Sequence, residues 1–120
     1  MSEQMVERRA CARRRVDLDV SAAVSPEMAL PRARAIDIGC GGLLMAFVEP
    51  IGFARGHKML VSMRLDDFRF NVLASVVRSE RGSDSRTYVA VEFIDIYATD
   101  YDDLCQRLDH SERMSNSASA

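Results

Sequence analysis

Residues 35–45 read Ala-Ile-Asp-Ile-Gly-Cys-Gly-Gly-Leu-Leu-Met, and the rest of the chain is organised around this stretch. Ile36 and Ile38 are typical of the end of one strand, and Leu43 begins the next, so the backbone must turn sharply between them. Glycine permits such a turn and lets another molecule approach the main chain. Asp37 stands at the edge of the turn, where its side chain can accept hydrogen bonds. Taken alone, the stretch is also typical of an ordinary β-turn capped by aspartate.

Apolar and polar residues alternate on both sides of this turn. The period of two is typical of half-buried strands and predicts six of them, at residues 16–24, 32–38, 43–48, 58–65, 68–76 and 87–93. After residue 95 the apolar residues recur at helical spacing, at Tyr97, Tyr101, Leu104 and Leu108. We therefore predict an all-β fold with one C-terminal helix, in which six strands form a small antiparallel β-barrel.

Charge is spread unevenly along the chain. Its 120 residues suit one domain, and the net charge is only −2. Residues 7–15 carry five arginines, whereas residues 92–112 carry seven acids and one arginine. We predict a flexible N-terminal arm, a barrel with its helix, and a disordered tail, over residues 1–15, 16–109 and 110–120 respectively.

The cysteines and histidines show no pattern of a metal or catalytic site. Cys11, Cys40 and Cys105 lack metal-ligand spacing, and we interpret them as free thiols in a reducing compartment. His57 and His110 have no nucleophile or carboxylate beside them, so we predict surface histidines and no enzyme. No apolar run approaches the roughly 18 residues of a membrane span. We expect a cytoplasmic protein without a cofactor, a metal or direct membrane insertion.

An arginine cluster precedes the first predicted strand. Arg9 and Arg13 stand in an RxxxR spacing, and Arg8 comes just before them. Because the arm leads straight into the first strand, these arginines and Asp37 can meet at one mouth of the barrel. An arginine fork matches the O6 and N7 acceptors of guanine, and a carboxylate accepts from its N–H donors. Phosphates favour arginine and backbone N–H groups near glycine. The combination matches a guanine nucleotide with anionic phosphates.

The two elements resemble the hallmark motifs of the PilZ domain family. That family carries RxxxR followed by [D/N]xSxxG, and the resemblance spans about residues 7–108 of this chain. It implies a split six-stranded barrel that binds the bacterial second messenger cyclic di-GMP. Gly39 stands where the family usually has serine, so one hydroxyl contact is lost. By this resemblance, the ligand-binding residues are Arg8, Arg9, Arg13, Asp37, Gly39 and Gly42.

Three functions stay open at this point. The first is a cyclic di-GMP receptor that transmits the signal to an unidentified protein partner through ordering of its N-terminal arm. The second is a PilZ-like adaptor that contacts proteins without binding nucleotide. The third is a barrel that uses its arginine arm on RNA or DNA. Phe68, Phe70 and Phe93 lie on apolar strand faces rather than on a stacking surface, so we expect no nucleic acid polymer as partner.

Overall fold

Strands make up most of the chain before a C-terminal helix, and the computed structural model describes residues 13–25 and 27–119. Residues 110–119 are described by their backbone only. The strands are β1 (Arg14–Ser25), β2 (Met28–Ala29), β3 (Ala33–Ile38), β4 (Gly42–Phe47), β5 (Lys58–Leu65), β6 (Phe68–Arg81) and β7 (Thr87–Asp95), and the helix α2 (Ala98–Ser119) follows them.

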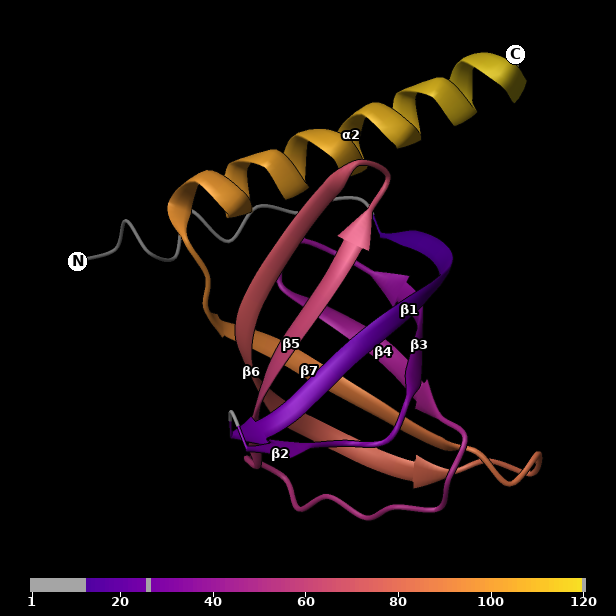
Figure 1. Cartoon of the computed structure of the whole chain (residues 1–120). Coiled ribbons are helices and arrows are strands. Elements are labelled where there is room, and N and C mark those ends of the chain that lie inside the picture. Colours follow the sequence, from indigo (N-terminus) through magenta and orange to yellow (C-terminus); the bar gives the residue numbers. More distant parts are fainter. Residues whose placement is uncertain (1–12, 26, 120) are drawn as a thin grey trace.

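Antiparallel pairing closes the sheet on itself. The strand order is β2-β1-β3-β4-β7-β6-β5, and β1 also pairs with β5. The sheet closes at Val20, which pairs with Ala33 of β3 on one side and with Met63 of β5 on the other. The two-residue strand β2 pairs only with the C-terminal end of β1. Within the described residues, six long strands therefore form a closed antiparallel barrel, which confirms the predicted fold (Figure 1).

The β5–β6 hairpin shows how alternation builds the core. Every second residue of β5 is buried, from Met59 to Leu65, while those between them face outward. Phe70 of β6 is 1% exposed and meets the ring of Phe93 on β7 edge to face. Burying large side chains from facing strands is the main stabilising contribution to a barrel of this size. Asp66 makes the connecting turn with a φ of 60°, a conformation that aspartate tolerates.

Helix α2 covers one end of the barrel. Leu104, Cys105 and Leu108 are fully buried and belong to the barrel's core, and Figure 1 shows the helix across the end where β1 starts and the β5–β6 turn lies. The helix begins at Ala98, so Tyr97 precedes it and is exposed, contrary to its predicted place on the apolar face. The helix ends at Ser119, and no proline or glycine interrupts it. The division of the chain into an arm, a barrel with its helix and a disordered tail stays a prediction.

Two cysteines meet beneath this helix. The Cys105 thiol lies 2.7 Å from the sulfur of Cys40, which follows β3, so this contact joins α2 to the β3–β4 turn. Cys105 keeps its thiol, as predicted, and is buried. Cys40 takes part in a disulfide that does not involve Cys105, so the prediction of a free thiol is wrong for Cys40. Cys11 lies outside the described residues. No helix in the described part of the chain combines the length and the apolar character that crossing a membrane requires.

Candidate arginine–carboxylate site at the barrel mouth

The turn between β3 and β4 is held on both sides by backbone hydrogen bonds. The Gly39 N–H donates to the Gly42 carbonyl at 2.9 Å, and the Phe93 N–H of β7 donates to the Gly41 carbonyl at 2.8 Å. Among the described glycines only Gly56 has a positive φ, so this turn does not use the left-handed freedom of glycine. Its glycines matter instead because they leave room for neighbouring groups.

Gly42 is the glycine that the barrel itself requires. It pairs with Glu92, and a Cβ at this position would collide with the carbonyl oxygen of Val91 on β7. The absence of a side chain therefore lets β4 approach β7 closely. This is a packing role, and a further role of Gly42 toward a ligand stays a prediction.

A β-bulge sets the direction of the Asp37 side chain. Ala35 pairs with Met45 and Asp37 with Leu44, so Ile36 is an extra residue in β3. The bulge breaks the alternation: Ile38 is fully buried, while Ile36 and Asp37 are both half-buried. The sequence pattern, in which Ile36 and Ile38 share one face, gives no sign of this bulge. It leaves the Asp37 carboxylate at the surface next to the start of β1.

Arg13 reaches this carboxylate from the other side. Its Nε donates to Asp37 Oδ1 at 2.8 Å, and its guanidinium also lies against Gly39. The side chains of Arg13 and Asp37 remain 53% and 29% exposed. The structure thus brings together three of the six predicted ligand-binding residues, Arg13, Asp37 and Gly39. Arg8 and Arg9 lie outside the described residues.

The neighbouring arginine contacts a different carboxylate at the same mouth. Arg14 donates to Asp66 of the β5–β6 turn at 3.2 Å. This hydrogen bond and the nearby positive charges of Arg14 and Arg107 hold the pKa of Asp66 below its usual value. Arg107 of α2 pairs with Asp67 at 3.0 Å and lies over the ring of Phe68. These contacts join β1, the hairpin turn and α2, and sequence reasoning missed them because they cross about 40 to 50 residues of chain.

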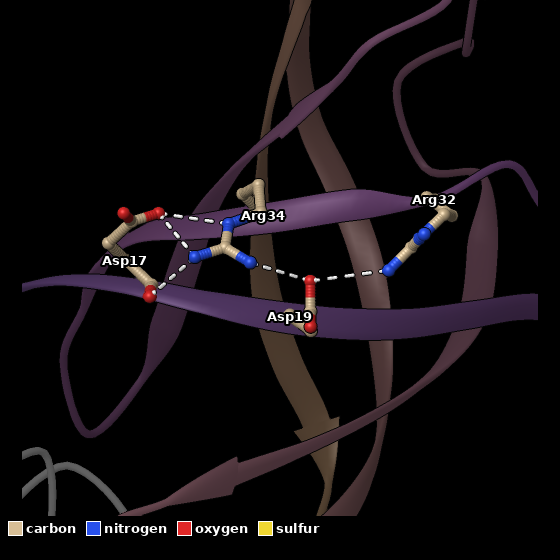
Figure 2. A network of polar contacts seen from close by, with 4 residues as sticks. All are labelled: Asp17, Asp19, Arg32 and Arg34. Carbon is tan, nitrogen blue, oxygen red and sulfur yellow. Dashed lines mark hydrogen bonds and ion pairs between the residues drawn. The ribbon is translucent and has the colours of Figure 1, made fainter.

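A fork of hydrogen bonds fixes β1 to β3 just beyond the mouth. Arg34 donates from Nε to Asp17 Oδ1 at 2.9 Å and from Nη1 to Asp19 Oδ1 at 2.6 Å, as Figure 2 shows. The hydrogen bonds to Asp17 and Asp19 raise the pKa of Arg34, so it carries its charge at every pH of interest. Arg32 approaches the same Asp19 oxygen at 3.9 Å. The network holds the strand that follows the arginine arm in a fixed register.

The other predicted features can be placed as well. His57 is half-buried rather than on the surface, because its ring packs 5.4 Å from the ring of Phe53. Its Nε2 has no hydrogen-bond partner among the described residues. The described residues hold no group of three or more His, Cys, Asp or Glu side chains arranged for a metal ion. At the mouth, Arg13 offers N–H donors suited to an anion or a base edge, and Asp37 offers carboxylate acceptors suited to N–H donors.

The sequence matches the family model described as the PilZ domain over residues 7–109. The match includes both the arginine arm and the Asp37 turn, and it ends within α2. The comparison with curated protein sequences gave no match.

Several solved structures share this fold. The inhibitor of motility MotI/DgrA from Bacillus subtilis is 23% identical, with a TM-score of 0.74, and the match covers 92% of this chain and 52% of that one. YcgR from Escherichia coli in complex with c-di-GMP is 14% identical, with a TM-score of 0.73 and coverages of 93% and 49%. The PilZ domain of YcgR with c-di-GMP is 14% identical, with a TM-score of 0.64 and coverages of 94% and 98%. The chain thus spans about half the length of the first two.

Proposed function

Since the chain belongs to the PilZ domain family, we propose that it is a receptor for cyclic di-GMP rather than an enzyme. The observation that carries the proposal is the meeting of Arg13 and Asp37, whose side chains lie 2.8 Å apart at the β3–β4 turn. These residues come from two separate motifs of the sequence and converge at one mouth of the barrel. Similar folds that hold c-di-GMP support the choice of ligand.

Each side chain has a defined task in this proposal. Arg13 donates to the O6 and N7 acceptors of a guanine or to a phosphate oxygen, and Asp37 accepts from the guanine N1–H and N2–H₂ donors. Arg8 and Arg9 of the arm supply further positive charge to the phosphates. Gly39 and Gly42 keep the turn narrow beside the base. The exposure of the Arg13 side chain, 53%, leaves it accessible to a ligand arriving from solvent.

We propose further that the ligand acts by fixing the part of the arm that precedes β1, residues 1–13, against the barrel. The arm is rich in arginine and poor in apolar residues, so charge-assisted contacts to the ligand have to offset the entropy lost on ordering. An ordered arm would create or cover a surface for a protein partner in the bacterial cytoplasm. The proposal requires neither a nucleic acid polymer nor a membrane as partner.

Calorimetric titration with cyclic di-GMP tests the proposal, with GTP and cyclic di-AMP as competing nucleotides. We expect saturable binding of cyclic di-GMP and much weaker binding of the other two. Equal affinity for all three nucleotides would show a non-specific anion site. No binding at all would overturn the receptor proposal and favour the adaptor that works through protein contacts alone.

A further inference from the structure

Arg13 lies across the β3–β4 turn at the place where residue 39 has no side chain. A Cβ on Gly39 would come 2.9 Å from Arg13 Nη1 and 3.4 Å from Arg13 Cγ. The first distance is shorter than Cβ contacts in folded proteins, so a side chain at residue 39 would shift the end of Arg13 from its present position. Gly39 itself has no positive φ, and its backbone does not demand glycine. The glycine at residue 39 is therefore explained by the space that Arg13 occupies and not by the backbone conformation of the turn.

The same arrangement engages one donor and one acceptor of the proposed site. Arg13 Nε donates to Asp37 Oδ1 at 2.8 Å, so this N–H cannot donate to a ligand while the pair is intact, and a ligand must share Oδ1 with it. We propose that Gly39 tunes the affinity of the site by permitting a closed, ligand-free state, in which Arg13 pairs with Asp37. This inference rests on the proposed function, because the closed pair lowers the affinity only if cyclic di-GMP needs Arg13 Nε or the whole Asp37 carboxylate.

The expected size of the effect follows from the exposure of the pair. Arg13 and Asp37 are 53% and 29% exposed, and ion pairs at such surfaces are weak because water and salt screen them. Opening the pair should therefore cost a factor of about 1.5 to 5 in ligand affinity. Gly39 adjusts the affinity within this range and does not switch binding on or off.

Gly39→Ala is the variant that tests the closed state, and Gly41→Ala is its matched control. The added Cβ at residue 39 meets the end of a flexible arginine, so the side chain moves and the barrel stays intact. A Cβ at Gly41 meets nothing within 4 Å. Both variants remove the same backbone freedom from the same turn. A difference between them therefore reports the contact with Arg13 and not the loss of a glycine.

The first measurement uses the ligand-free protein. In nitrogen-15 NMR spectra, the Nε–Hε signal of Arg13 should be protected from exchange with water in wild type and in Gly41→Ala. In Gly39→Ala that protection should be lost, while the melting temperature stays as in wild type. An Arg13 signal that is equally protected in Gly39→Ala would overturn the inference, whatever the ligand does.

The second measurement is calorimetric titration of the three proteins with cyclic di-GMP. We expect Gly39→Ala to bind about 1.5 to 5 times more tightly than wild type, and Gly41→Ala to bind as wild type does. Binding by wild type with no gain, or a loss, in Gly39→Ala would overturn the inference and leave the receptor proposal intact. Binding by none of the three would overturn the receptor proposal itself, and this inference with it.

Discussion

At Gly42 the backbones of β4 and β7 come so close that any side chain would strike a carbonyl oxygen. The obstacle is a strand of the closed barrel, which cannot move aside as a flexible side chain can. We predict that Gly42→Ala lowers the free energy of unfolding by about 1–3 kcal/mol, as overpacking typically does. Chemical denaturation measures this, with Gly41→Ala as the control because its Cβ meets open space. Equal stability of the two variants would contradict the packing role of Gly42.

Arg13 and Asp37 differ from Gly42 because they contribute little to the core. Arg13→Ala or Asp37→Ala should lower the affinity for cyclic di-GMP ten- to a hundredfold, since charge-assisted hydrogen bonds contribute about 1.5–3 kcal/mol. The melting temperature of the ligand-free protein should stay within error, because the pair is exposed. Arg81→Gln, an exposed arginine at the end of β6, is the control for the loss of charge. Wild-type affinity in either site variant would remove these residues from the site.

The spacing of these residues could be predicted from the sequence, but their geometry could not. The sequence has RxxxR just before the first strand and Asp37 at a glycine turn. This order was sufficient to predict that the arginines and Asp37 meet at one mouth of the barrel. The direct pair between Arg13 and Asp37 depends on the bulge at Ile36, and a bulge depends on how two strands register against each other. Period-two alternation within one strand contains no information about that register.

Helix α2 is attached to the barrel by its buried face. Leu104 is fully buried among the core residues at the end of the barrel. We predict that Leu104→Ala lowers the free energy of unfolding by about 2–5 kcal/mol, through lost burial and the cavity that remains. Gln106→Ala, on the exposed face of the same helix, should change it by less than about 0.5 kcal/mol. Similar effects of both substitutions in urea denaturation would mean that the helix does not seal the barrel in solution.

The pair between Arg14 of β1 and Asp66 of the β5–β6 turn makes the stability of the protein depend on pH. The pKa of Asp66 is lowered in the folded state, chiefly by its hydrogen bond from Arg14, and lies near 3.9 in an unfolded chain. A lowered folded pKa means that the pair stabilises the protein above about pH 4, and that this contribution is lost as the pH falls through the folded value. Asp66→Asn keeps a residue that tolerates positive φ but removes the charge.

We therefore predict that Asp66→Asn melts at a lower temperature than wild type at pH 7, and that the difference shrinks toward pH 3. Asp95→Asn, which neutralises an exposed aspartate at the end of β7, should show no such convergence. Thermal melts at pH 7, 5 and 3 make the comparison. A difference that stays constant over this range would mean that the Arg14–Asp66 pair contributes nothing to the acid response.

At the scale of the whole molecule, the alternation of apolar and polar residues was sufficient to predict the barrel. It was not sufficient to predict where β6 ends or that the short strand β2 exists. The β5–β6 hairpin was predicted at its observed turn, because Met59 to Leu65 and Phe68 to Val76 alternate without a break. Strand β6 nevertheless runs on to Arg81, where most residues are exposed and only pairing with β7 keeps them extended. The short β2 has no apolar pattern, since both of its residues are exposed, and it exists only through its pairing with β1.

The link between the site and a partner is a property of the whole chain, and amide hydrogen exchange tests it. The proposed ligand contacts both the arm and the β3–β4 turn, so binding should fix one against the other. The arm residues that precede β1, 7–13, should therefore gain protection when cyclic di-GMP is added, at the cost in backbone entropy of roughly 1–2 kcal/mol per residue. Strand β6 is paired on both sides in the closed barrel and should change little, which makes it the internal control. The Gly39→Ala variant should show the same gain at lower ligand concentration. An arm that is already protected without ligand would mean that the site is preformed, and the signal would then have to pass through another change.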